Sequence, residues 1–171
     1  MIAHTSQSGA PAAASIAEES GSVLHVLRAV YEELRAHGEE TYPRECCGAL
    51  LGKPAAGGWR DACGWRIEAL MRTANAHTDF ARYEIAPPEL VKIANEARSL
   101  GLEIAGFYHS HPDHAVQWSA ADLDGAHWVG LSYMITEVVK GKAAITRAWL
   151  LAGTREEDKH FEPQEMRIED C

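Results

Sequence analysis

Hydrophobic residues recur along this chain with two different periods, and the longer period predicts three helices. Residues 23–34 place their apolar side chains at helical spacing and Gly38 offers a stop, so we expect a helix over Ser22–His37. Similar spacing predicts a second helix that starts at the prolines 87–88 and closes at Gly101. A short third helix is expected to begin at Ser119.

Short apolar runs bounded by turn residues predict the strands. The expected strands are Cys47–Gly52, one bent or two short strands within Trp59–Thr73, Glu103–Tyr108, Leu131–Val138, Ala143–Leu151 and a late strand at Met166–Ile168. Loops are expected over Asn75–Tyr83 and His109–Trp118, and residues 139–142 suit a hairpin turn. Helices that interrupt hairpin-linked strands favour a mixed α/β (α+β) fold with a largely antiparallel central sheet flanked by helices.

The length of 171 residues fits one compact domain and leaves no room for two full ones. Residues 1–22 are rich in Ala, Ser and Gly without periodicity, so we expect a flexible N-terminal tail. The domain itself is expected over residues 23–152, and residues 153–171 form a charged C-terminal extension.

The charge balance excludes several classes of partner. Lys and Arg number 16 and Asp and Glu number 25, which gives a net charge of −9 that repels nucleic acid and anionic membrane surfaces. The sequence has neither a membrane-spanning apolar stretch nor a signal peptide, so we expect a cytoplasmic protein. The oligomeric state, a homodimer included, is left open.

The four cysteines, Cys46, Cys47, Cys63 and Cys171, do not form a CxxC pair of the kind that builds a structural zinc site. Cys46 and Cys47 lie in an apolar segment, where cysteine usually behaves as a small buried hydrophobe. We therefore expect neither a disulfide framework nor a cysteine nucleophile.

The segment from Tyr108 to Asp122 carries the candidate chemistry. In an extended chain, residues two apart point to the same side, so His109 and His111 can present both imidazoles to one point. Ser119 is a candidate helix N-cap that would turn Asp122 back toward them. Two imidazoles and one carboxylate leave the fourth tetrahedral position of zinc open for water, as in catalytic zinc sites.

A zinc hydrolase also needs a proton acceptor that is not itself a ligand, and Glu45 at the start of an apolar strand is the candidate. Each element has a simpler explanation when taken alone. A His-x-His pair often makes ordinary hydrogen bonds, Ser-x-x-Asp is a common capping box, and Glu45 alone is a surface acid. His77, His114 and His127 are expected to be bystanders.

Taken together, these residues resemble the signature of the JAMM metalloproteases, also called the JAB or MPN-plus family. That signature is met here by Glu45, His109-Ser110-His111-Pro112, the seven residues from Pro112 to Trp118, and Ser119-Ala-Ala-Asp122. Residues 44–52 resemble the first-strand motif of the bacterial and archaeal branch, and the resemblance covers roughly residues 23–152. Trp118 departs from the pattern, because the family often has proline there.

The resemblance implies the cytidine-deaminase-like JAB/MPN architecture and one zinc ion with a bound water, held by His109, His111 and Asp122. It also implies that Glu45 handles the proton of the water and that Ser119 helps stabilise the oxyanion. The implied reaction cleaves a peptide or isopeptide bond after the C-terminal Gly-Gly of a ubiquitin-like or sulfur-carrier protein, for instance releasing cysteine or another amine. Residues 75–83 could line a groove for that tail.

Three alternatives remain on the sequence alone. Some relatives of this fold have lost the metal and act as assembly scaffolds, although the complete ligand set here disfavours that role. The same metal site could instead hydrolyse a small molecule, or serve a DNA-repair-associated relative of unknown chemistry.

Overall fold

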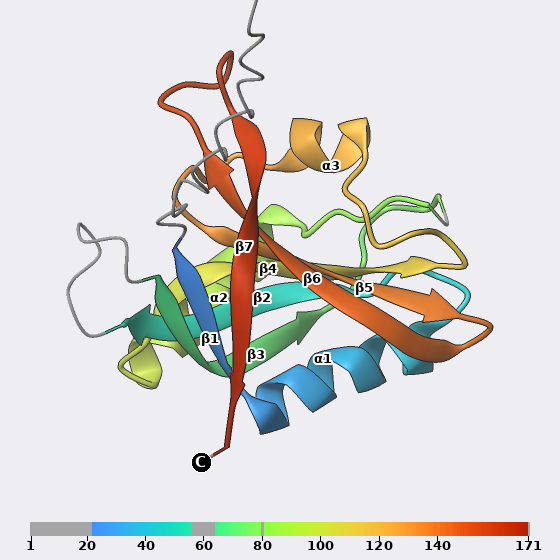
Figure 1. Cartoon of the computed structure of the whole chain (residues 1–171), viewed down its shortest axis with the longest axis horizontal. Coiled ribbons are helices and arrows are strands. Elements are labelled where there is room, and N and C mark those ends of the chain that lie inside the picture. Colours follow the sequence, from blue (N-terminus) through green and yellow to red (C-terminus); the bar gives the residue numbers. More distant parts are fainter. Residues whose placement is uncertain (1–21, 56–63, 80, 171) are drawn as a thin grey trace, which may run out of the picture.

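The computed structural model describes residues 22–55, 64–79 and 81–170. Within these ranges, seven strands close into a barrel in the order β1-β3-β2-β4-β5-β6-β7, with three helices packed outside (Figure 1). The elements are β1 Val23–Leu27, α1 Arg28–Thr41, β2 Cys47–Pro54, β3 Trp65–Thr73, α2 Pro87–Ser99, β4 Glu103–Pro112, α3 Ala120–Gly125, β5 Ser132–Val139, β6 Lys142–Ala152 and β7 His160–Glu169. The expected tail falls almost wholly in residues 1–21, outside the described residues.

The mixed sheet and its flanking helices are confirmed, and the sheet is closed. Four neighbouring pairs are antiparallel, namely β2–β3, β2–β4, β5–β6 and β6–β7, whereas β1–β3, β1–β7 and β4–β5 are parallel. Closure depends on β1, which pairs with β3 on one side and β7 on the other. The first and last described strands therefore lie side by side (Figure 1).

The prediction of one continuous helix over Ser22–His37 is wrong for its first residues. Residues 23–27 form β1, with Leu24 and Val26 fully buried and their neighbours partly exposed, and the helix begins at Arg28. The apolar spacing in this short segment satisfies either period, and the pairing with two distant strands selects the extended form. The late strand is also longer than expected, spanning the ten residues of β7.

Side chains on the two faces of the strands form two hydrophobic clusters. Leu50, Tyr108 and Met134 pack beneath α1, together with the apolar residues of β1. Ala49 and Phe107, which neighbour the first two in sequence, point to the opposite face and pack with residues of α2. This alternation means that successive residues of β4 face two different environments.

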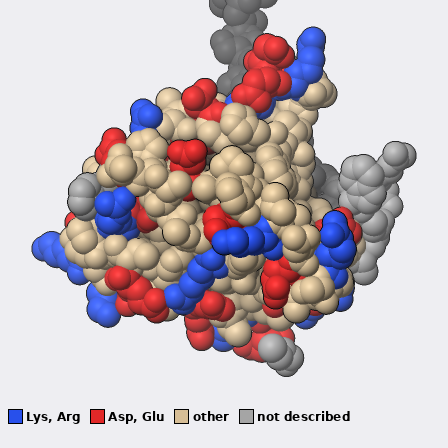
Figure 2. Space-filling view, turned by 180° about the vertical axis from the view of Figure 1, so that it is seen from behind, with Lys and Arg blue, Asp and Glu red and all other residues tan. Residues whose placement is uncertain are grey.

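The described surface carries charged side chains of both signs. Figure 2 shows acidic and basic side chains interspersed on one face, with uncharged surface between them. None of the described helices is long and apolar enough to cross a membrane.

Candidate metal centre

Strand β4 carries both candidate histidines. It continues to Pro112, four residues beyond the predicted end, and pairs in parallel with β5 so that His109 lies opposite Ile135 and His111 opposite Glu137. The expectation that the histidines lie in a loop is therefore wrong, because the β5 ladder extends the strand. The two residues are only 2% and 7% exposed, and the strand period places their side chains on the same face.

Helix α3 brings the third candidate ligand to the histidines. Ser119 is its N-cap, and the Oγ atom accepts a hydrogen bond from the backbone N–H of Asp122 at 3.2 Å. In return, Oδ2 of Asp122 accepts from the backbone N–H of Ser119 at 2.6 Å. This reciprocal capping box confirms the predicted cap and fixes the Asp122 side chain at the start of the helix.

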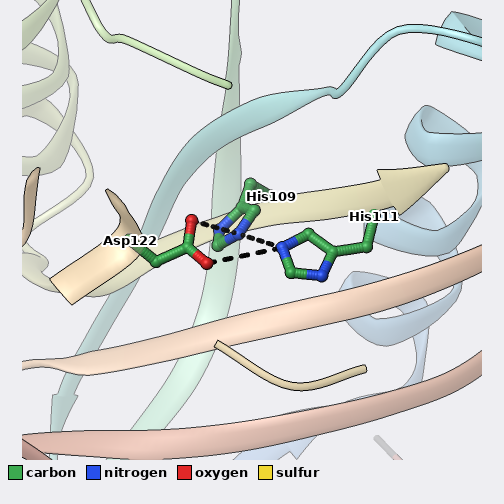
Figure 3. Close-up of side chains that lie close together, drawn as sticks. All are labelled: His109, His111 and Asp122. Atoms are coloured by element: carbon green, nitrogen blue, oxygen red, sulfur yellow. Dashed lines mark hydrogen bonds and ion pairs between the residues drawn. The ribbon is translucent and has the colours of Figure 1, made fainter. Parts of the chain in front are cut away.

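The three side chains converge on one point, and Figure 3 shows the carboxylate of Asp122 facing both imidazoles. The Nε2 atoms of His109 and His111 lie 3.1 Å apart. Asp122 Oδ1 lies 3.2 Å from Nε2 of His109, and its Oδ2 lies 3.5 Å from Nε2 of His111. Tetrahedral zinc with bonds of about 2.0–2.1 Å requires ligand atoms about 3.3 Å apart, so this donor set fits the ion.

The residues around the ligands orient them. Nδ1 of His111 lies 2.9 Å from the carbonyl oxygen of Ala115, which favours the tautomer with Nδ1–H donating and leaves Nε2 free to bind metal. The ring of Tyr83 stacks on that of His109, with centroids 4.3 Å apart and planes inclined by 23°. The sequence did not predict either contact: it placed Tyr83 only in a groove-lining loop and did not single out Ala115, since both contacts depend on how the loops fold back onto β4.

Burial and proximity shift the pKa values of the three groups in different directions. Burial lowers the pKa of His109, whereas hydrogen bonds to Asp122 and Ala115 outweigh burial and raise the pKa of His111. Burial opposes ionisation of Asp122 too, but the two imidazoles hold the pKa of its carboxyl well below the usual range. Asp122 is therefore ionised at neutral pH, as a metal ligand must be.

Glu45 lies two residues before the start of β2 and is only 5% exposed. Its Oε2 atom is buried without a hydrogen-bond partner among the described residues. Burial raises its pKa to about 7; the nearby charge of His111 opposes this shift, and those of Asp122 and Asp79 add to it. Glu45 is thus a buried carboxyl close to the ligands, with an oxygen available for another partner.

Asn75 holds the loop beside Glu45 in place. Its Nδ2 donates to the carbonyl oxygens of Glu45 and Arg82, at 3.2 and 2.9 Å, and its Oδ1 accepts from the backbone N–H groups of His77 and Glu84. Asn is a frequent turn residue, but the sequence does not show that this one reaches Glu45.

A cavity of about 540 Å³ opens beside Asp122. Its lining includes the loop residues Arg82 and Tyr83, residues of α3, and the aromatic side chains Phe107, Trp128 and Tyr133. His77 and His127 also line it, whereas His114 is exposed and lies outside the metal-ligand group found in the described residues.

Cys46 and Cys47 are buried and unpaired, as expected. Burial raises the pKa of the two thiols to about 12 and 11, so neither forms a thiolate at neutral pH. Cys63 and Cys171 lie outside the described residues.

Comparisons with known proteins show which families and relatives this chain is similar to. Residues 27–152 match the family described as prokaryotic homologues of the JAB domain. The chain is 34% identical over 94 residues to the desampylase of Haloferax volcanii, covering 54% of this chain and 62% of that protein. It is 29% identical over 109 residues to a Thermus thermophilus protein named "Probable TtuB-protein conjugate cleaving protease", covering 63% and 66%. The chain thus spans slightly less than two thirds of either relative.

Solved structures show the same fold. A protein from Salinibacter ruber superposes with a TM-score of 0.63 at 32% identity, covering 84% of this chain and 91% of that one. A JAB1/MPN domain protein from Archaeoglobus fulgidus superposes with a TM-score of 0.50 at 15% identity, covering 86% and 99%. On the family match, which spans most of the barrel and all three candidate ligands, this chain belongs to the prokaryotic JAB family.

Proposed function

We propose that this protein is a zinc-dependent metallopeptidase that cleaves a peptide or isopeptide bond after the C-terminal Gly-Gly of a ubiquitin-like or sulfur-carrier protein. The observation that carries the proposal is the convergence of His109, His111 and Asp122, with ligand atoms 3.1–3.5 Å apart, near the buried carboxyl of Glu45. The names of the two relatives, a desampylase and a conjugate-cleaving protease, support this reaction class.

In the proposed site His109 and His111 would hold one zinc ion through Nε2, and Asp122 would hold it through a carboxylate oxygen. When bound, zinc supplies a Lewis acid that lowers the pKa of a water molecule to about 7 and leaves one position for that water. Because Nδ1 of His111 is already engaged by Ala115, the ring enters the site in the required orientation.

Glu45 accepts a proton from the attacking water and returns it to the leaving amine. A carboxyl with a pKa near 7 can take and release a proton at neutral pH, and its unpartnered Oε2 is available to do so. The water oxygen adds to the carbonyl carbon, the C–N bond breaks, and the amine leaves as the neutral product. No covalent enzyme intermediate is required, which agrees with the buried, protonated state of Cys46 and Cys47.

Ser119 stabilises the oxyanion that develops on the carbonyl oxygen. Its Oγ accepts from Asp122 N–H, so the hydroxyl hydrogen is free to donate, and the residue is exposed. One hydroxyl therefore both caps α3 and faces the substrate.

The cavity beside Asp122 receives the substrate tail in this proposal. Residues 77 and 81–83 line one side and α3 lines another, so an extended tail reaching the zinc site would pass between them. Glycine lacks a side chain, so a Gly-Gly terminus can approach the metal more closely than other residues can. A hydrolase of a small molecule is the second candidate, because about 540 Å³ is also the size of a small-molecule site.

The test is cleavage of a ubiquitin-like protein extended beyond its Gly-Gly, with zinc-loaded protein, chelator-treated protein and chelator-treated protein resupplied with zinc. The proposal predicts cleavage, loss of cleavage and recovery, in that order. Zinc binding without cleavage of any such fusion would favour the small-molecule hydrolase, and a chain that binds no metal would favour the scaffold.

A further inference from the structure

Helix α3 carries Asp122, but the helix is too short and too exposed to keep its own position. It is six residues long, too short to be stable alone, and none of its residues is buried. A ligand on such a helix keeps its place only if other elements fix the helix from outside. Leu123 packs against the core, and further contacts come from residues 153–161, beyond the segment that matches the family.

Lys159 caps the C-terminal end of α3. Its Nζ donates to the carbonyl oxygens of Asp124 and Ala126 at 3.0 and 2.9 Å, and it also pairs with the carboxylate of Glu156. The last carbonyls of a helix lack partners within the helix and carry partial negative charge, so an ammonium group satisfies both needs. The Lys159 side chain is only 7% exposed, which is unusual for lysine.

The loop that presents Lys159 is itself braced. Oδ1 of Asp158 accepts from the backbone N–H groups of Thr154 and Arg155 at 2.9 and 2.7 Å, and its Oδ2 accepts from the Thr154 hydroxyl at 2.7 Å. Gly153 opens the loop with φ at +122°, where a Cβ would lie 2.9 Å from the Cα of Lys159. These contacts fix the direction from which Lys159 reaches α3.

The N-terminal end of α3 is held by aromatic packing. Trp118, immediately before the N-cap Ser119, lies against Phe161 of β7 with ring centroids 5.6 Å apart. Phe161 is 8% exposed and packs in turn on Tyr133 of β5 at 5.2 Å. Trp118, the residue that departs from the family pattern, thus contacts β7.

We propose that residues 153–161 clamp α3 at both ends and thereby position Asp122 for metal binding, with Lys159 as a positioning residue. The inference rests on the proposed metal site. Beyond that site, the clamp makes the position of Asp122 depend on the β6–β7 connection and the start of β7.

The test compares the zinc affinity of Lys159→Met with that of the wild type, by competition against a chromophoric chelator. Loss of a group that supports a ligand typically weakens metal binding about 10- to 100-fold, and we expect a weakening in this range. Lys142→Met is the matched control, because Lys142 also forms an ion pair, with Glu39, but on an 83% exposed side chain far from α3. It should bind zinc as the wild type does.

Two further readouts separate positioning from general stability. Cleavage by Lys159→Met should fail at limiting zinc and recover in excess zinc, and Lys159→Arg, which keeps a cationic donor, should regain most of the affinity. In zinc-free protein, the amides of residues 120–126 should exchange with solvent faster in Lys159→Met than in the wild type. If Lys159→Met does not fold, the same measurements on Lys159→Gln test whether Lys159 positions Asp122.

Wild-type zinc affinity in a folded Lys159→Met protein would overturn the clamp and leave the proposed function intact. A wild-type chain that binds no zinc would overturn the proposed function. Even then, hydrogen exchange of the α3 amides would test whether Lys159 holds the helix. Equal exchange rates in Lys159→Met and the wild type would contradict that role.

Discussion

Strand β4 places polar side chains on both of its faces, toward α1 on one side and toward α3 on the other. Toward α1, the hydroxyl of Tyr108 lies 2.9 Å from Nδ1 of His37, and Oγ of Ser110 accepts from the backbone N–H of Cys46 at 2.9 Å. Toward α3, Nδ1 of His109 and Oε2 of the neighbouring Glu45 are buried and have no hydrogen-bond partner in the described part of the chain.

The polar groups that face α1 are paired and serve stability, whereas those that face α3 are unpaired and serve the proposed chemistry. A buried polar group that is fully paired contributes to stability, because its hydrogen bonds replace those lost to water. A buried polar group that is unpaired costs stability unless something else in its working state satisfies it. We therefore expect changes on the α1 face to alter stability alone and changes on the α3 face to alter activity first.

The largest expected effect is that of Glu45→Gln on turnover. Glutamine keeps the shape of the side chain but cannot accept the proton, so cleavage should fall about 10³-fold while zinc affinity stays within about twofold of the wild type. Steady-state kinetics and chelator competition measure the two quantities. A Glu45→Gln protein that cleaves at the wild-type rate would remove Glu45 from the mechanism.

On the α1 face, acid should destabilise the fold through His37. Burial, assisted by the charge of Arg72, lowers the pKa of His37 to about 4 from its ordinary 6.5. The unfolded chain therefore binds this proton before the folded chain does, so the stabilisation is complete above pH 6.5 and is lost as the pH falls toward 4. The loss should reach about 3 kcal/mol, read from urea unfolding at several pH values.

His37→Asn is the control for the acid effect, because asparagine does not titrate. Its unfolding free energy should fall less steeply than that of the wild type between pH 6.5 and 4. Equal slopes in the two proteins would show that His37 does not contribute.

The next effect is that of Tyr108→Phe, which removes one hydroxyl from the α1 face. The buried Nδ1 of His37 would lose its partner, so the free energy of unfolding should fall by about 1–3 kcal/mol. Zinc affinity should not change, although Tyr108 is adjacent to His109 in sequence. Weakened zinc binding in this variant would show that the two faces are coupled.

The smallest effect is expected for Ser119→Ala, which should lower both the stability of the fold and the rate of cleavage. Loss of the N-cap should lower stability by about 1 kcal/mol, and loss of the hydroxyl donor should lower cleavage by at least about tenfold. Ser119→Gly offers a comparison, since glycine is a better cap than alanine but restores no hydroxyl. If Ser119→Gly recovered the lost cleavage together with the stability, Ser119 would act only as a cap.

The sequence correctly predicted those features that depend on residues close together in the chain. The buried run of β2, the proline start of α2 and the capping box of Ser119 and Asp122 each depend on residues a few positions apart, and the structure has all three. The pairing of His109 with His111 across one intervening residue belongs to the same class.

Features that depend on distant partners could not be predicted. Residues 23–27 become a strand only because β3 and β7 lie on either side of them. The extension of β4 past Tyr108 depends on its ladder with β5, and the stacking of Tyr83 on His109 depends on how the residues before α2 lie against β4. Lys159 has no sequence signal at all, because a lysine in a charged segment usually lies in solvent.

The most direct test of the account is the zinc content of purified protein after dialysis against limiting zinc. The wild type and Glu45→Gln should each retain one ion per chain, whereas Asp122→Ala should retain none while keeping its circular dichroism spectrum. A folded wild type without zinc, or an Asp122→Ala protein that still holds one ion, would contradict the claim that His109, His111 and Asp122 form the metal centre.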